Sequence, residues 1–239
     1  IKKLTSSNQS YYQFISNIYE KFKSWSPAIF IGYNIIKFDE EMLRNAFFKN
    51  LYDPYLTIKE SNFRSDLLEA VRASNYFYPD RIKSLVNNKG NPILRLDSIA
   101  PINGIKNFTA HDALGDVYAT FEIAKIIKNK LPQFWNTCTN ELSKFSLEKK
   151  VNVEPFCYLE SFYGRTKAFC LSYIDVHPRY KWALCFDLKE DPEKVLNMND
   201  DTLNDYLEKS PKVIRNLKLN KSPLLFDIKL QNMLDDYKL

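Results

Sequence analysis

Histidine is scarce in this chain of 239 residues, which contains only His111 and His177. Two histidines exclude a metal cluster built from several imidazoles, such as that of HD-type phosphohydrolases. The four cysteines include no Cys-x-x-Cys pair. We therefore expect neither a zinc site nor a disulfide framework, but reduced thiols of the kind found in the cytosol.

Long apolar runs are also absent. No stretch approaches the length of a membrane span, and no signal peptide opens the printed sequence. We therefore expect a cytoplasmic protein without a membrane partner. The first residue is Ile1 rather than Met, from which we expect that the true N-terminus lies upstream.

The composition is that of a folded protein, with 45% hydrophobic and 15% aromatic residues. The 34 Lys and Arg residues outnumber the 29 Asp and Glu residues and give a formal net charge of +5. This mild excess favours an anionic partner but does not identify one.

The first half of the chain has an α/β pattern. Apolar residues at helical spacing predict a helix over residues 11–25, capped by Ser6 or Ser7, and the apolar run 28–33 predicts a buried strand. A new helical period begins at Phe38. Because helices and a strand alternate through residue 131, we assign this half to the α/β class. Two further helices are predicted over 64–74, with Asp66 as the cap and Arg72 facing outward, and over 94–100.

The second half has a β pattern. Short aromatic and β-branched runs bounded by turn residues are typical of a small β-barrel or sandwich. One helix, capped by Asp200 or Asp201, interrupts them. The predicted strands are 156–159, 168–174, 181–188 and 213–219.

Residues 110–120 place His111 just before a predicted helix and Asp116 one turn inside it. A carboxylate that holds a divalent cation, beside an imidazole that takes a proton from water, suits hydrolysis by metal-activated water. The alternative, equally compatible with this segment alone, is that Asp112 or Asp116 only complements the helix dipole. The apolar residues at helical spacing, expected to form the buried face, are Val117, Tyr118, Phe121, Ala124, Ile127 and Leu131.

Asp39 is the second candidate carboxylate. It lies between the predicted strand and the next helix, at the carboxyl end of the strand, where open α/β sheets bind their ligands. The alternative is a structural carboxylate at a helix N-terminus. The presence of Asp116 at the start of another helix favours a shared metal site. Glu40 and Glu41 are expected on a solvated face.

Several motifs resemble one family. Gly32-Tyr33-Asn34 with Phe38-Asp39, the helix at Leu94-Arg95-Leu96, and His111-Asp112-Ala113 with Asp116 resemble the second and third motifs of the DEDDh 3′→5′ exonucleases, which have an RNase H-like fold. More narrowly, the strings at 38–41, 50–55, 111–120 and 220–223 resemble the bacterial exodeoxyribonuclease I family across nearly the whole chain.

The resemblance implies an RNase H-like exonuclease domain at 1–135, without its first strands, followed by a partial SH3-like barrel at 136–239 that binds DNA. It implies 3′→5′ hydrolysis of single-stranded DNA to nucleoside 5′-monophosphates with two Mg²⁺ ions, for which Mn²⁺ can substitute. Asp39 and Asp116 would be metal ligands and His111 the general base. Residues that contact DNA would be Arg95, Arg44, Tyr55, Arg72 and Lys144. For each arginine the alternative is a surface ion pair, more so for Arg44 and Arg72 than for Arg95.

The chain departs from this family in one respect. The first family motif, Asp-x-Glu on the first strand, would precede residue 28 and is absent there. The only Asp-x-Glu spacings are Asp39/Glu41 and Asp191/Glu193. We therefore expect an internal fragment that is inactive by itself, because two of the four acidic ligands are missing.

The resemblance also bears on partners. We expect a bacterial, cytoplasmic monomer that binds single-stranded DNA. The family binds the acidic tail of single-strand-binding protein, which is therefore a second candidate partner. Tyr78 stands before Pro79 where a basic side chain is expected, so this chain departs from the family pattern at that point. Two alternatives stay open: an RNA-trimming relative on the same scaffold, and a non-catalytic module that binds single-stranded nucleic acid.

Overall fold

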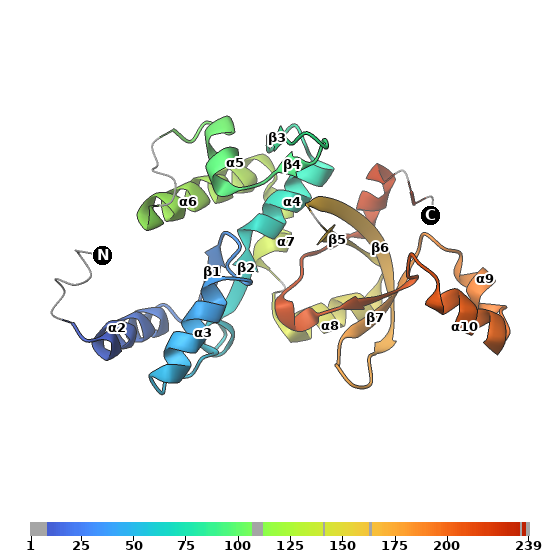
Figure 1. Cartoon of the computed structure of the whole chain (residues 1–239), viewed down its shortest axis with the longest axis horizontal. Coiled ribbons are helices and arrows are strands. Elements are labelled where there is room, and N and C mark those ends of the chain that lie inside the picture. Colours follow the sequence, from blue (N-terminus) through green and yellow to red (C-terminus); the bar gives the residue numbers. More distant parts are fainter. Residues whose placement is uncertain (1–8, 107–111, 141, 163, 235, 238–239) are drawn as a thin grey trace. The chain divides into compact units, whose positions relative to one another are not determined.

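The structure is a computed structural model, which describes residues 9–106, 112–140, 142–162, 164–234 and 236–237. The chain divides into two compact units, Ile1–Leu67 and Leu68–Leu239. Figure 1 shows the elements of both. The predicted domain boundary between residues 135 and 136 stays a prediction. None of the described helices is long and apolar enough to cross a membrane.

The first unit contains a β-α-β arrangement. Strand β1 (Ile29–Gly32) pairs in parallel with β2 (Phe63–Asp66), and helix α3 (Asp39–Lys49) lies in the connection between them, followed by the 3₁₀ helix η1 (Leu56–Ile58). Parallel neighbours need such a long connection because a tight turn would reverse the chain. The predicted strand at 28–33 and the helix after Phe38 are confirmed.

Strand β2 shows that the prediction of a helix from Arg64 was wrong. Residues 64–66 are extended, and helix α4 (Leu67–Phe77) begins only after them. Asp66 directly precedes α4, and its predicted role as the cap of that helix stays a prediction. Its buried carboxylate accepts hydrogen bonds from the backbone N–H groups of Asn34 (2.8 Å) and Ile36 (3.3 Å). A local pattern of helix-forming residues was overridden here by pairing with β1.

Helix α2 (Tyr11–Ser24) begins with a capping box. The N–H of Gln13 donates to Ser10 Oγ (3.2 Å), and the N–H of Ser10 donates to Gln13 Oε1 (2.9 Å), so two otherwise unpaired donors are satisfied. The cap is Ser10, not Ser6 or Ser7 as predicted. Phe22 on this helix stacks on Phe30 of β1, with ring centroids 5.1 Å apart, and thus packs α2 against the strand.

The second unit begins with helices and a short hairpin. The helix predicted at 94–100 is confirmed but begins at Leu96, with Arg95 as the preceding cap residue. Helices α7 and α8 were not predicted. The stacked rings of Phe134 on α7 and Phe226, 4.9 Å apart, join this region to the sheet that follows. The elements are α4, the hairpin β3 (Leu85–Val86) and β4 (Pro92–Ile93), α5 (Leu96–Ile102), α6 (Ala113–Lys130), α7 (Pro132–Thr139) and α8 (Lys144–Val153).

Helix α6 confirms the helix after His111, but its predicted buried face was largely wrong. Val117 and Phe121 are 65% and 60% exposed, whereas Ala119, Ile123 and Ile127 are fully buried. Of the predicted stripe, only Ile127 is buried. Apolar residues occur on most sides of this helix, so periodicity alone could not decide which side faces the core.

An antiparallel sheet dominates the rest of the second unit, with strand order β8-β7-β6-β5-β9. The predicted strands are confirmed, and β9 was missed. Among the described residues the sheet stays open, because the edge strands β8 and β9 do not pair with each other. Helix α8 packs against the sheet, where its Leu147 and Val151 join Phe156, Phe169 and other apolar residues in the core. The strands are β5 (Phe156–Phe162), β6 (Arg165–Val176), β7 (Ala183–Asp187), β8 (Ile214–Leu217) and β9 (Leu225–Asp227).

The remaining elements are short. Helix α9 (Pro192–Leu196) and helix α10 (Asp200–Glu208) separate β7 from β8, and α10 is capped by Asn199 rather than by Asp200 or Asp201 as predicted. The 3₁₀ helices η2 (Leu219–Lys221) and η3 (Ile228–Met233) precede and follow β9. Near the end of the chain, the hydroxyl of Tyr237 donates to the buried Asp187 of β7 (2.6 Å), which fixes this segment to the sheet.

The observed orientation of α6 predicts unequal effects of truncation on its two sides. Ile123→Ala should lower the free energy of unfolding by about 2–5 kcal/mol, because it leaves a cavity in the core. Phe121→Ala, on the exposed side of the same helix, should change it by less than about 1 kcal/mol. Urea unfolding followed by circular dichroism measures both. A larger loss for Phe121→Ala would show that the predicted face, not the observed one, is buried.

Candidate functional site

The loop between β1 and α3 positions Asp39. Asp66, at the end of β2, pairs in register with Gly32 and binds the loop through the N–H groups of Asn34 and Ile36. A Cβ on Gly32 would lie 3.0 Å from side-chain atoms of Ile35, so glycine permits this close turn. Asp39 is the first residue of α3 and is exposed, at the carboxyl end of the strand as predicted.

The next residue, Glu40, points the opposite way. It is 3% exposed, and its carboxylate pairs with the buried guanidinium of Arg64 on β2 and with Arg44 one helical turn on (3.0 Å). The hydroxyl of Thr57 donates to the same carboxylate (2.9 Å). The prediction that Glu40 lies on a solvated face was wrong. This carboxylate joins α3, β2 and η1, and so determines how the helix that begins with Asp39 is held.

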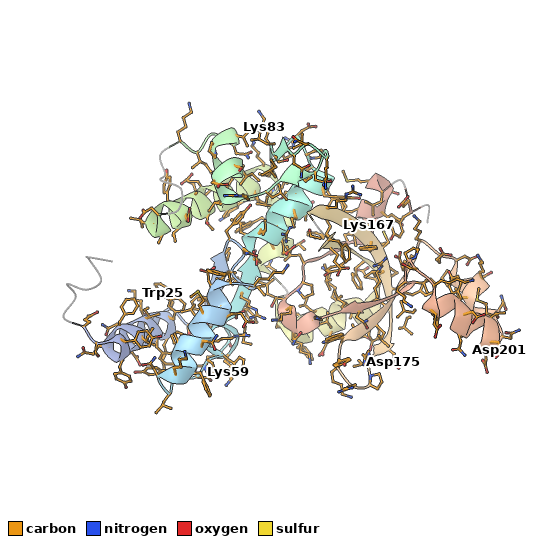
Figure 2. The ribbon with its side chains drawn as sticks, viewed as in Figure 1. Trp25, Lys59, Lys83, Lys167, Asp175 and Asp201 are labelled. Atoms are coloured by element: carbon orange, nitrogen blue, oxygen red, sulfur yellow. The ribbon has the colours of Figure 1, made fainter. Side chains whose placement is uncertain are left out.

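Arg44 and Tyr55, both predicted DNA contacts, lie together in the first unit. The guanidinium of Arg44 lies 5.0 Å from the centroid of the Tyr55 ring, and the ammonium of Lys59 lies 5.7 Å from it. Lys59, which Figure 2 labels, also pairs with Asp53 at 2.6 Å. This hydrogen bond lowers the pKa of Asp53 and raises that of Lys59. An exposed ring with two cations beside it is suited to contact a base and its phosphates.

Asp116 lies in the first turn of α6 and is partly exposed. The cap of this helix is Asp112, whose carboxylate accepts a hydrogen bond from the N–H of Gly115 (3.2 Å). For Asp112 this contact agrees with the alternative interpretation, in which the carboxylate only stabilises the helix N-terminus. His111 lies outside the described residues. Asp39 and Asp116 belong to different units, so their shared metal site stays a prediction. Within the described residues, no group of three or more His, Cys, Asp or Glu side chains is close enough to hold a metal.

The other predicted DNA contacts are cations in ion pairs. Arg72 pairs with Glu69 at 2.5 Å and is partly buried, not facing outward as predicted. Arg95 pairs with Asp97 at 2.5 Å, and Lys144 pairs with Glu148 at 3.2 Å. The side chains of Arg95 and Lys144 are 69% and 57% exposed, so solvent weakens both pairs and leaves them exchangeable for a phosphate.

Comparison with known proteins finds relatives of one kind. It is 31% identical over 210 residues to the exodeoxyribonuclease I of Escherichia coli, a stretch that covers 82% of this chain and 44% of the relative. The exodeoxyribonuclease I of Haemophilus influenzae is 33% identical over 198 residues, or 80% of this chain and 42% of the relative. This chain is a homologue of exodeoxyribonuclease I. It spans about half the length of the relatives that it matches. No protein-family model matches it.

Solved structures of exonuclease I agree with the sequence comparison. Escherichia coli exonuclease I in complex with a dA16 oligonucleotide is similar with a TM-score of 0.76 and 28% identity, over 93% of this chain and 50% of that chain. The enzyme of Methylocaldum szegediense has a TM-score of 0.76 and 26% identity, with the same two coverages. The ExoI/SSB-Ct complex has a TM-score of 0.75 and 26% identity, over 97% of this chain and 52% of that chain. The predicted resemblance to exodeoxyribonuclease I and the predicted α/β fold are thereby confirmed.

The sequence analysis missed several residues that shape the site of this exodeoxyribonuclease I homologue. Glu40 and Arg44 have the i,i+4 spacing of a helical ion pair, a signal that could have identified the partner of Arg44. Asp66 gave no such signal, because its partners are backbone groups 30 and 32 residues away. Lys59 was also missed, since its contact with Tyr55 depends on the conformation of the loop.

Removal of the Glu40 charge should destabilise the first unit. We expect Glu40→Gln to lower the free energy of local unfolding by about 3 kcal/mol or more, because the buried guanidinium of Arg64 loses this carboxylate. Glu41→Gln is the matched control, since Glu41 is exposed on the same turn. Amide hydrogen exchange of β1 and β2, read by mass spectrometry, measures both changes. Equal exchange in the two variants would contradict the role of Glu40.

Proposed function

We propose that this chain is part of a 3′→5′ exonuclease that hydrolyses single-stranded DNA to nucleoside 5′-monophosphates. The observation that carries the proposal is its 31–33% identity to exodeoxyribonuclease I over about four-fifths of its length. The similarity to exonuclease I in complex with a dA16 oligonucleotide supports the substrate. The net charge of +5 is compatible with a polyanion.

The proposed catalytic residues are Asp39, Asp116 and His111. Carboxylate oxygens are hard donors that fit Mg²⁺, or Mn²⁺ in its place, and both described carboxylates lie in the first turn of a helix with solvent access. When bound, two such ions would supply activation of the attacking water and stabilisation of charge on the leaving 3′-oxygen. His111 would accept the proton of that water.

The strand of DNA would pass along the cations and the ring already described. Arg44 and Tyr55 would contact it in the first unit, and Arg72, Arg95 and Lys144 in the second. We assign the first half of the chain to an RNase H-like nuclease domain and the five-stranded sheet to part of an SH3-like DNA-binding domain. The strands of this sheet pair in the antiparallel direction, and β6 carries a bulge between Tyr173 and Asp175. Such bulges bend a strand, as the wall of a barrel requires.

The acidic tail of single-strand-binding protein is a second proposed partner. The ExoI/SSB-Ct complex is similar to this chain over 97% of its length. At the position where a basic residue is expected, however, the ring of Tyr78 packs edge-on against Phe134, with centroids 6.2 Å apart. Binding of the acidic tail would therefore depend on cations near Tyr78 rather than on a basic residue at that position.

We expect the 239-residue chain to hydrolyse little DNA by itself, because two of the four acidic ligands are absent from its sequence. The measurement is gel analysis of 5′-labelled single-stranded DNA and RNA oligomers with Mg²⁺. The same chain extended by its upstream reading frame should degrade the DNA. Preference of the extended protein for RNA would favour the RNA-trimming alternative. Binding without degradation would favour the non-catalytic module.

In the extended protein, His111→Ala should lower kcat by roughly 10²–10⁴-fold, the usual contribution of a general base. The Kd for a dT oligomer, measured by fluorescence anisotropy in EDTA, should change far less, because the imidazole acts on water rather than on the strand. Parallel losses in kcat and affinity would instead identify His111 as a binding residue.

A further inference from the structure

Two of the four cysteines face each other across neighbouring strands of the five-stranded sheet. Cys157 of β5 and Cys170 of β6 are directly opposite in the antiparallel ladder, and their Sγ atoms lie 3.6 Å apart. Both thiols are free and fully buried. Figure 1 labels the two strands. The sequence analysis did not identify this pair, because only the register of the strands brings the two residues together.

The backbone around the pair has the geometry of a disulfide site. The N–H of Leu188 donates to the carbonyl of Cys170 (2.9 Å). The N–H and C=O of one strand residue point to the same side, so those of Cys170 point away from β5. Cys157 and Cys170 are therefore a non-hydrogen-bonded pair, in which the Cα atoms lie about 4.5 Å apart. The Cα atoms of disulfides lie roughly 4.4–6.8 Å apart, so rotation of the two side chains suffices to join the sulfurs.

The pair lies on the face of the sheet that points away from α8. Phe156 and Phe169, the residues next to the two cysteines, pack in the core with α8, and successive side chains of a strand point to opposite faces. On the face of the cysteines, Phe226 of β9 pairs in register with Cys157 and stacks on Phe134 of α7. The thiols are thus enclosed between the sheet and a helix, and an oxidant reaches them only during local opening.

The four thiols differ in reactivity. The hydrogen bond that the Cys170 thiol donates to Cys157 lowers the pKa of Cys157 and raises that of Cys170. Burial raises the pKa of Cys138 and of Cys185 to about 12. Because the thiolate is the form that reacts with oxidants, Cys157 is the expected point of attack, and Cys170 is already in contact with it.

We propose that Cys157 and Cys170 are a redox site, which forms a cross-strand disulfide in the presence of hydrogen peroxide and thereby locks β5 to β6. The thiolate of Cys157 attacks one peroxide oxygen, the O–O bond breaks, and the hydroxide that leaves takes up the proton that Cys157 had released. The products are water and a sulfenic acid.

The second step closes the bond. The sulfur of Cys170 attacks the sulfenic sulfur of Cys157, and the hydroxide that leaves takes the thiol proton and forms a second water. Two electrons have then passed from the two thiols to the peroxide, and a thiol reductant returns them to the disulfide. The site uses none of the proposed catalytic residues, so it goes beyond the proposed function and does not depend on it.

The test is peroxide treatment of the folded 239-residue chain, followed by alkylation of free thiols, trypsin digestion and mass spectrometry without reduction. Trypsin cleaves after Arg165 and Lys167, between the two cysteines, so the disulfide would join the peptides of residues 151–165 and 168–179. Dithiothreitol should separate them again. Sulfoxide on the exposed Met42 shows that the peroxide has acted. Oxidised Met42 with both cysteines still reduced would overturn the proposal.

The same treatment in urea tests whether the folded sheet selects the pair. Cys170 is nearly the same number of residues from Cys157 as from Cys185, so an unfolded chain should form both disulfides to similar extents. The folded chain should form only the bond between Cys157 and Cys170. Equal amounts of the two bonds in the folded chain, or bonds between two chains, would contradict the proposed geometry.

Single variants separate the roles of the two thiols. In Cys170→Ala, the oxidation of Cys157 should stop at the sulfenic acid, which dimedone traps, whereas in Cys157→Ala the thiol of Cys170 should stay reduced. Cys185→Ala is the matched control, because it removes an equally buried thiol from the opposite face of the same sheet and should leave the disulfide unchanged. Trapping in Cys157→Ala but not in Cys170→Ala would overturn the assignment of Cys157 as the residue attacked.

The lock on the sheet is measured by thermal unfolding. Oxidation should raise the Tm of the unsubstituted chain by roughly 5–10 °C, because the cross-link restricts the unfolded state, and Cys170→Ala should show no such rise. A disulfide that leaves the Tm unchanged or lowers it would refute the lock. None of these readouts involves DNA, so their failure would leave the proposed function standing.

Discussion

The buried carboxylate of Glu40 is the interaction on which the candidate site depends most. Isolated charges are costly to bury, and this one is stabilised by two guanidinium groups and a hydroxyl from three different elements. Because Glu40 follows Asp39 directly, its inward orientation on α3 leaves Asp39 on the outer side. One residue of the pair thus anchors the helix and the other is available to a ligand.

Asp66 has a corresponding role for the loop before α3. Its two oxygens accept from the N–H groups of Asn34 and Ile36, in a turn where Asn34 has a positive φ of 61°. Buried charge-assisted hydrogen bonds of this kind offset the cost of such a turn and fix the chain between Gly32 and Asp39. Asp39, Glu40 and Asp66, which belong to the start of α3 and the end of β2, therefore differ in their roles because they differ in burial and partners.

The sequence was sufficient to predict a helix or strand where the pattern that defines it is local. The apolar run at β1, the aromatic and β-branched runs at β5 to β7 and the helix after Asp112 were all predicted, because such runs and the helical period are visible in short windows. It was insufficient where contact with residues far away in the sequence determines the conformation or the buried face. Residues 64–66 have helix-compatible neighbours but pair with β1, and α6 carries apolar residues on several sides, so only packing selects Ala119, Ile123 and Ile127.

The same distinction applies to the candidate site. Family motifs predicted Asp39, Arg44 and Tyr55, and the structure places the latter two in contact. No motif indicated that Glu40 is buried, since an exposed face and a buried ion pair have the same local sequence.

In the proposed function, the pairing of each cation determines what it could contribute to DNA binding. Arg44 is held by the buried Glu40, so a phosphate competes with a carboxylate that the fold itself requires, and its main contribution is a fixed position beside Tyr55. The pairs of Arg95 with Asp97 and of Lys144 with Glu148 are more exposed, so a phosphate can replace the carboxylate there at little cost. In the proposed function Arg95 and Lys144 would therefore raise affinity with a strong salt dependence. The Arg44 and Tyr55 pair would instead fix the geometry of the strand and depend less on salt.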